Sequence, residues 1–203
     1  MKGVLDRGGV FLAIFFGLVL FFMGGLAYLL LMLWFFALAM FVTRYEYEIK
    51  REMGLYEHER GWENVLSNGL LPSILAALSP TLGAMPFICS LAAVTADKFG
   101  SEIGVLEADD PISLFNFKKV KPWTSGAVSK IGTVGSLAGA VSIAFGAIIL
   151  FKISAGQAIL VTIAGFVGCI VDSLVGVLEE RGIGTKGTTN FICSLVGAMV
   201  GLI

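Results

Sequence analysis

The sequence has few of the residues on which common catalytic sites depend. Its single histidine, His58, lies in a charged segment and is expected to be solvated, so neither zinc chemistry nor a Ser-His-Asp triad is predicted. Its three cysteines lie in apolar runs, lack metal-ligand spacing and are odd in number, which argues against a disulfide framework. We interpret Cys89, Cys169 and Cys193 as packing residues. The net charge of −1 gives no indication of a nucleic-acid partner.

Charge is also scarce, since only 14% of the 203 residues are charged whereas 57% are hydrophobic. A soluble domain of this length does not need so much apolar surface. The sequence therefore predicts an all-α fold, a polytopic membrane bundle of about seven transmembrane helices. The number is six if the first two runs form one long kinked helix with a re-entrant piece. The seven apolar runs lie at about residues 8–22, 26–42, 65–78, 82–96, 128–151, 155–178 and 189–203.

We expect one helical membrane domain over residues 1–203. It begins with a helical pair in residues 1–43, in which Gly24 and Gly25 offer a turn, followed by a cytoplasmic helix or loop in residues 44–63. Residues 64–203 form the expected catalytic core, which contains a cytoplasmic loop at residues 104–123. That loop forms either a short hairpin over the site or a solvated connector. Glycines of the last three runs are expected to form faces for close helix packing.

The basic residues indicate the orientation in the membrane. With seven helices, all of the 14 basic residues except Lys152 fall on one side. The positive-inside rule places that side, and with it the amino terminus, in the cytoplasm. The predicted location is an integral membrane protein, in the cell membrane of a prokaryote or otherwise in an organellar membrane, with its active site on the cytoplasmic side.

Twelve polar residues lie at the ends or in the lower parts of the apolar runs, all at the cytoplasmic end of this topology. Charged and amide groups inside a membrane are costly and are usually retained for a site. For each residue alone, helix capping or packing is the alternative interpretation. The twelve are Asn64, Asn68, Asp97, Ser101, Glu102, Thr124, Ser125, Ser129, Lys130, Asp172, Ser173 and Asn190.

Three carboxylates suggest a Mg²⁺ site with catalytic residues Asp97, Glu102 and Asp172, because carboxylate and phosphate oxygens are ligands that Mg²⁺ prefers. Glu102 follows Asp97 by five residues, so on a regular helix the two point in different directions. We expect Gly100 to let the helix unwind so that both face one ion.

A hydroxyl-rich helix start suggests a phosphate site, which we assign to the nucleotide on the resemblance given below, since helix amino termini attract anions. Its predicted members are Lys121, Thr124, Ser125, Gly126, Ser129 and Lys130. Asn64, Asn68, Ser101 and Asn190 are predicted to bind the acceptor substrate, with Asn68 also among the catalytic residues. Together these groups suggest phosphoryl transfer. The third and fourth runs, which we expect Pro72 and Pro86 to break, leave room for a lipid tail.

Five short motifs occur in a recognisable order: Asn64-Val-Leu-Ser-Asn-Gly69, Ala96-Asp-Lys-Phe-Gly-Ser-Glu-Ile-Gly104, Ser125-Gly-Ala-Val-Ser-Lys-Ile-Gly132, Asp172-Ser-Leu-Val-Gly176 and Thr189-Asn-Phe191. In them the chain resembles an integral membrane family that contains the plant phytyl-phosphate kinase of tocopherol synthesis and many microbial relatives. The resemblance covers about residues 60–203. The chain departs from the family at Lys98, where the family usually has threonine. It also departs at Trp123-Thr124-Ser125, where the family often has Gly-Thr before the glycine-valine-serine stretch.

This resemblance implies a Mg²⁺-dependent kinase that uses CTP, or another nucleoside triphosphate, to convert an isoprenoid monophosphate into the diphosphate. The implied partners are CTP, a prenyl monophosphate and membrane lipid, and a homodimer is compatible with it. Two alternatives stay open. One is a cytidylyltransferase that attaches CMP to a lipid phosphate, and the other is an ion-coupled transporter with Asp97 and Asp172 as carrier carboxylates.

Overall fold

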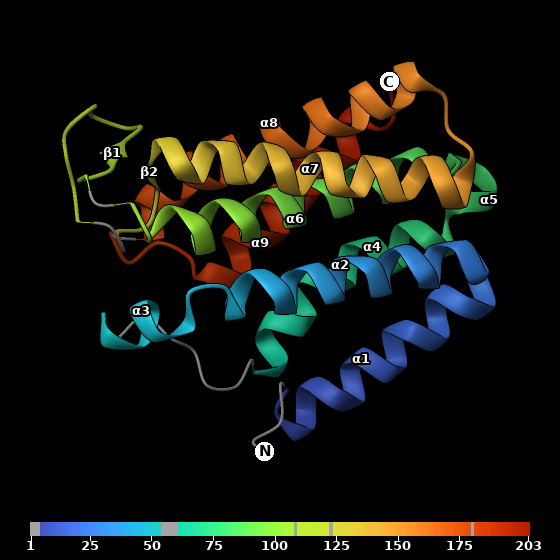
Figure 1. Ribbon diagram of the computed structural model, residues 1–203. Helices are drawn as coiled ribbons and strands as arrows, with labels where there is room; N and C mark the ends of the chain where they lie inside the picture. Colours follow the sequence, from blue (N-terminus) through green and yellow to red (C-terminus); the bar gives the residue numbers. More distant parts are fainter. Residues whose placement is uncertain (1–4, 54–60, 108, 122–123, 180) are drawn as a thin grey trace.

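The long helices lie side by side along a common direction, with α1 tilted away from the rest (Figure 1). The computed structural model describes residues 5–53, 61–107, 109–121, 124–179 and 181–203, so His58 and Trp123 lie outside the described residues. Short elements at the bundle ends are η1 (Leu20–Gly24), α3 (Tyr47–Glu52), α5 (Ser79–Leu82), β1 (Ile112–Ser113) and β2 (Ala127–Val128). The long helices are α1 (Arg7–Val19), α2 (Leu26–Arg44), α4 (Trp62–Ala77), α6 (Met85–Gly104), α7 (Lys130–Phe151), α8 (Ala155–Glu179) and α9 (Lys186–Val200).

The amino-terminal pair consists of two separate helices, as one of the two sequence interpretations predicted. The last turn of the first helix widens into the π-helix η1, and Gly25 then takes a φ of 99°, a conformation that glycine adopts without steric cost. The chain reverses there. Helix α1 packs on α4, whereas α2 packs on α6 and α7.

Helix α6 forms the centre of the bundle because glycines on its neighbours let their backbones come close. A Cβ atom at Gly139 of α7 would lie 2.7 Å from the carbonyl oxygen of Thr95. One at Gly197 of α9 would lie 2.6 Å from the carbonyl oxygen of Cys89. The predicted small-residue faces are therefore confirmed, and each of them meets α6. Cys89 and Cys193 are fully buried packing residues at these contacts.

Four helices are long and apolar enough to cross a membrane within the part of the chain that the structure describes. They are Arg7–Gly24, Leu26–Arg44, Lys130–Phe151 and Ala155–Glu179. The remaining long helices, α4, α6 and α9, pack against them. The all-helical membrane fold is thus confirmed, whereas the number of seven spans stays a prediction.

Two prolines do not have the effect expected from the sequence. Pro72 lies inside α4, which nevertheless continues from Trp62 to Ala77. Pro86 lies in the first turn of α6, where its missing N–H breaks no hydrogen bond of the helix. The expectation that these prolines break their helices is wrong, and neither proline lines the cavity described below.

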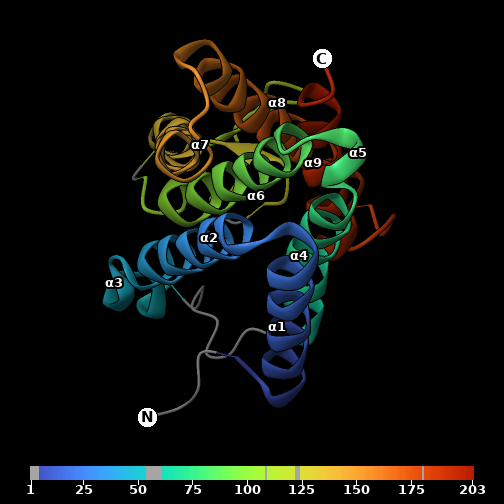
Figure 2. The same cartoon turned by 90° about the vertical axis from the view of Figure 1, so that its right-hand side faces the viewer.

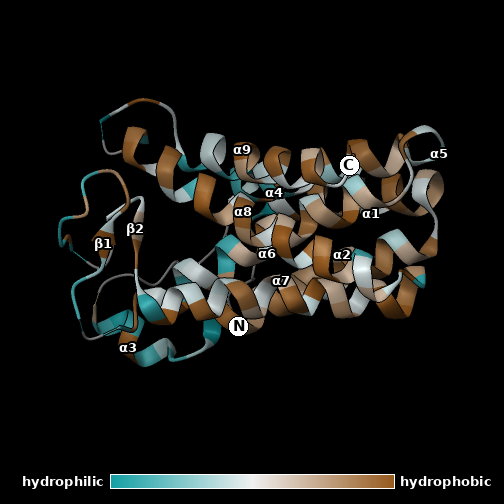
Figure 3. Ribbon diagram, turned by 90° about the horizontal axis from the view of Figure 1, so that it is seen from above, coloured by the Kyte–Doolittle hydropathy of each residue, from teal (hydrophilic) through white to brown (hydrophobic). Residues whose placement is uncertain are grey.

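Hydrophilic residues gather at the end of the bundle that carries α3 and the two short strands (Figure 3). There β1 pairs antiparallel with β2, and Ile112 also bridges to Lys119 across a tight turn. The described part of residues 104–123 therefore turns back on itself between Ile112 and Lys119, whereas the strand partner of β1 lies beyond this loop. That a hairpin lies over the site stays a prediction. The guanidinium of Arg181 lies 4.6 Å from the ring centre of Phe115, so the turn leans toward the α8–α9 connection. Lys152 lies in the α7–α8 connection.

Candidate functional site

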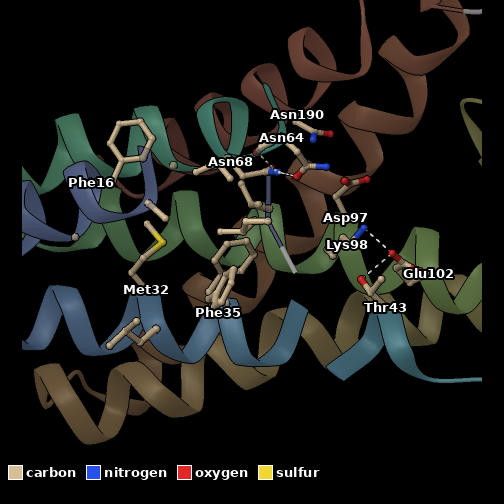
Figure 4. Close-up of a pocket in the computed structure, with 18 of the residues that line it drawn as sticks. Phe16, Met32, Phe35, Thr43, Asn64, Asn68, Asp97, Lys98, Glu102 and Asn190 are labelled. Atoms are coloured by element: carbon tan, nitrogen blue, oxygen red, sulfur yellow. Dashed lines mark hydrogen bonds and ion pairs between the residues drawn. The ribbon is translucent and has the colours of Figure 1, made fainter. Parts of the chain in front are cut away.

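A cavity of about 540 Å³ begins at the polar end and continues between the amino-terminal helices (Figure 4). Its apolar arm is lined from α1 and α2, where Phe16, Met32 and Phe35 lie on the side away from the polar groups. Its polar head is lined by Thr43, Lys50, Asn64, Asn68, Asp97, Lys98, Ser101, Glu102, Lys186 and Asn190. The cavity is therefore amphiphilic, with charge at one end and hydrocarbon at the other.

Three helices supply the charged centre of the polar head. The ammonium of Lys186, in the first turn of α9, lies 3.2 Å from Oδ2 of Asp172 on α8 and 4.0 Å from Oδ1 of Asp97 on α6. Asp172 is buried directly behind Lys186, and its Oδ1 accepts no hydrogen bond from any described residue. The structure thus brings together two of the predicted carboxylates, with a cation between them.

Lys186 is a site residue that the sequence analysis did not select. It was counted only as a basic residue of the cytoplasmic side. The signal for it is its position four residues before Asn190 at a helix start, because residues four apart share a helix face. Its side chain is 52% exposed, so the ammonium can move without unpacking the helix.

Asparagines line the polar head together with Asp97 (Figure 4). The amide nitrogen of Asn68 donates to Oδ1 of Asn64 at 2.8 Å, which fixes the orientation of both side chains on α4. Asn190 is buried, and its Oδ1 has no hydrogen-bond donor among the described residues. The Ser101 hydroxyl donates to the Asp97 carbonyl within α6 while it also lines the cavity. The four predicted acceptor-binding residues therefore meet in one place.

Glu102 has a different role from the one predicted. Helix α6 is regular through Gly100, so Glu102 points away from Asp97 and the expected unwinding is wrong. Its carboxylate forms ion pairs with Lys98 and with Lys50 of α3, and it accepts a hydrogen bond from Thr43 of α2. Glu102 therefore ties the polar end of α6 to α2 and α3.

The donor set of the polar head fits Mg²⁺ through two carboxylates. The described residues contain no group of three or more His, Cys, Asp or Glu that could hold a metal, so the predicted three-carboxylate site is corrected to the pair of Asp97 and Asp172. Mg²⁺ usually takes one or two protein carboxylates and completes its shell with water and substrate phosphates. The unpartnered oxygens of Asp172 and Asn190 are ligands of the right chemical class.

The predicted nucleotide segment lies beside this site and outside the cavity. Ser129 caps α7, because its hydroxyl accepts from the Gly132 N–H at 3.0 Å. Glu107 accepts from the Ile131 N–H at 3.0 Å, so the backbone donors of both Ile131 and Gly132 at this helix start are occupied. Gly126 packs against the Ser173 backbone, one residue beyond Asp172. None of the residues of this set lines the cavity: Lys121, Thr124, Ser125, Gly126, Ser129 and Lys130.

Curated relatives of the chain include two proteins that are named as membrane proteins. An uncharacterised membrane protein of Methanocaldococcus jannaschii is 36% identical over 98% of this chain and 85% of its own length. Protein PGR of Arabidopsis thaliana is 27% identical over 76% of this chain. An uncharacterised membrane protein of Synechocystis is 28% identical, also over 76%. The matched regions span only 65% and 63% of the last two relatives.

No solved structure matches the chain. The family of integral membrane proteins called DUF92 matches residues 1–198. The match includes every helix that contributes to the cavity, from α1 through the first turns of α9. The chain therefore belongs to the DUF92 family of integral membrane proteins.

Proposed function

We propose that the protein is a membrane-embedded kinase that transfers the γ-phosphate of CTP to an isoprenoid monophosphate of the phytyl or geranylgeranyl type, forming the prenyl diphosphate. The observation that carries the proposal is the continuity of the cavity, which joins an apolar arm to a charged head. A prenyl monophosphate has the same division into a long hydrocarbon tail and one anionic group. The motifs shared with the phytyl-phosphate kinase family support the choice of reaction.

The polar head offers ammonium groups that a phosphate can contact. Three lysines and two carboxylates line it, and Asp172 behind Lys186 brings its formal charge to zero, so a bound Mg²⁺ would leave it positive. Lysine binds phosphate as a compact positive charge. Lys186 is best placed to do so because its side chain is half exposed, whereas Lys50 is almost fully buried against Glu102.

In this proposal Asp97 and Asp172 would hold Mg²⁺, which would supply neutralisation of the charge on the transferred phosphoryl group. Lys186, which lies between the two carboxylates, would contact the acceptor phosphate. The amide oxygen of Asn190 and the paired amides of Asn64 and Asn68 orient the acceptor and metal-bound water. These side chains would therefore hold the acceptor phosphate next to the γ-phosphate of the nucleotide. Such positioning is most of what phosphoryl transfer requires.

The acceptor needs no general base. An oxygen of the ionised prenyl phosphate forms the new bond to the γ-phosphorus, while the bond from that phosphorus to the β–γ bridging oxygen breaks and CDP leaves. The proposal accordingly assigns no histidine to the reaction, and the described residues that line the polar head include none. Residues 121–130 remain the proposed binding site for the nucleotide phosphates. The reason is that Gly126 packs against the backbone of Ser173, the residue that follows Asp172.

Incubation of the purified full chain with Mg²⁺, geranylgeranyl monophosphate and CTP labelled on either the α- or the γ-phosphate tests the proposal. The kinase forms CDP and a prenyl diphosphate that carries the γ-label. A cytidylyltransferase instead forms a lipid that carries the α-label, together with pyrophosphate. Absence of labelled lipid with CTP, UTP and ATP would reject both enzymes and favour the carrier hypothesis.

A further inference from the structure

The two amino-terminal helices form a V whose arms diverge toward the polar end. Figure 2 shows α1 lying along α4 while α2 runs away from it toward α6 and α7. The arms meet through η1, near which Gly17 faces Leu29: a Cβ atom at Gly17 would lie 3.8 Å from Cδ1 of Leu29. The apolar arm of the cavity occupies the inside of this V.

The described residues leave the V open along its side. Ile14 on α1 and Leu33 on α2 both line the cavity, yet they are 57% and 50% exposed. Both helices are among those apolar enough to cross a membrane, so the outer surface beside the gap faces hydrocarbon. The cavity therefore opens sideways at bilayer depth as well as at the polar end.

We propose that the gap between α1 and α2 is a lateral entrance through which the tail of a single-chain lipid phosphate slides from the bilayer into the cavity. The identity of the head group rests on the proposed function; the path of the tail rests on the shape of the V. From Leu29 to Thr43, α2 rises about 20 Å, enough for an extended tail of roughly that length beside a head group at the polar end.

The lining favours a lipid tail with one anionic group. The apolar arm is lined by side chains such as Phe16, Met32 and Phe35, and it leads to a head lined by charged and amide groups. A flexible hydrocarbon chain fits, and the charged head lies where its phosphate arrives.

The entrance has a consequence for selectivity. A tail that moves from bilayer to cavity leaves one apolar phase for another, so its length adds little binding free energy. Because the V is open, the end of a longer tail can remain in the bilayer. The site therefore selects the head group strictly and the tail length weakly.

A bridge across the V on the folded, purified full chain tests the entrance. Ile14→Cys and Leu33→Cys are joined by a bis-maleimide whose linker contains a cleavable disulfide. The control pair is Phe15→Cys and Leu30→Cys, which are exposed on the same helices but do not line the cavity. Wild-type protein treated with the reagent controls for the native cysteines, of which Cys89 and Cys193 are fully buried.

Binding of labelled geranylgeranyl monophosphate from vesicles, with Mg²⁺ but without nucleotide, is expected to fall at least tenfold after bridging and to return after cleavage. Binding of water-soluble isopentenyl monophosphate, which enters from the polar end, is expected to change less than threefold. Equal loss of both ligands, or no loss of either, would overturn the entrance. This assay contains no nucleotide, so it measures binding alone. If binding behaves as expected but the separate assay with labelled CTP shows no turnover, the kinase is rejected and the entrance is not.

A second variant replaces the bridge if the linker does not span the gap. Ala13→Trp places a large ring in the apolar arm, whereas Leu12→Trp places the same ring on α1 at a position that does not line the cavity. Only Ala13→Trp should weaken binding of the long-tailed ligand. Equal effects of the two variants on that ligand would count against the entrance.

Discussion

The side-chain nitrogen of Lys186 donates to Oδ2 of Asp172 at 3.2 Å across the turn between α8 and α9. The two residues are 14 positions apart, and Asp97 of a third helix completes the group. Two carboxylates close to the same ammonium stabilise positive charge at this place. Substitutions of Asp172 and Lys186 therefore test this group directly.

Asp172→Asn is expected to lower phosphoryl transfer more than tenfold and to leave the yield of folded protein near that of the wild type. The amide keeps the shape of the side chain but removes the charge of a proposed Mg²⁺ ligand, and a tenfold change in rate is about 1.4 kcal/mol. Turnover and size-exclusion profiles in detergent provide the measurement. Asp109→Asn, at an exposed position outside the cavity, is the control. More than a tenth of wild-type activity would contradict the metal role.

Lys186→Met is expected to raise the KM for the prenyl monophosphate by more than about tenfold, because a hydrogen bond to a charged group is worth about 1.5–3 kcal/mol. Lys186→Arg, which keeps the charge, should recover part of the loss. Lys152→Met, at the opposite end of the bundle, is the matched control for loss of one lysine. An unchanged KM with a lowered kcat would show that Lys186 does not bind the acceptor in the ground state.

Glu102→Gln is expected to destabilise the fold by about 3 kcal/mol while leaving the Mg²⁺ concentration for half-maximal turnover unchanged. The reason is that Lys50, 1% exposed, would lose its partner carboxylate and keep, among the described residues, the Val42 carbonyl. The apparent unfolding temperature and a Mg²⁺ titration are the two measurements. A rise of more than fivefold in the required Mg²⁺ would restore the original prediction that Glu102 is a metal ligand.

The control for Glu102→Gln is Glu48→Gln, which breaks the exposed pair of Glu48 and Arg51. An exposed ion pair contributes little to stability, typically less than about 1 kcal/mol, because solvent screens it and both side chains lose freedom. The unfolding temperature of this variant should therefore stay close to that of the wild type. An equal decrease in the unfolding temperature of both variants would show that the burial of Lys50 does not cause the destabilisation by Glu102→Gln.

The start of α7 is expected to loosen in acid. The Ile131 N–H donates to the Glu107 carboxylate and holds its pKa below the ordinary value of 4.5. A carboxyl whose pKa is lower in the folded state stabilises that state above its unfolded pKa, and this stabilisation is lost as the pH falls through the folded pKa. Amide exchange of Ile131, corrected for intrinsic rates, should therefore accelerate below pH 4.5. In Glu107→Gln the corrected rate should be raised already at neutral pH and should not change with acid.

Much of the architecture followed from local pattern. Long apolar runs predicted the helices, and the pair Gly24 and Gly25 predicted the reversal between the first two, because only glycine takes a φ of 99° without strain. The glycines of α7 to α9 predicted close packing, although they did not show that every such face meets α6. Proline was misleading at Pro72, where the rest of the helix holds its shape.

The candidate site was predicted less completely, and the reason is geometric. Spacing along a helix showed that Asn64 and Asn68 share a face, and their hydrogen bond follows from it. Spacing did not show which lysine approaches which carboxylate. Glu102 pairs with Lys50, 52 residues earlier in the chain, because α3 folds back onto the end of α6.

Sequence alone determined that this chain is a helical membrane protein with its polar groups at one end, since hydropathy and helical period are local properties. Tertiary structure decided that Lys186 lies between Asp97 and Asp172, that Glu102 is a structural anchor, and that the apolar arm of the cavity lies between α1 and α2. These three results depend on how each helix is rotated and tilted against its neighbours. That arrangement is set by packing of the whole bundle, which no single segment encodes.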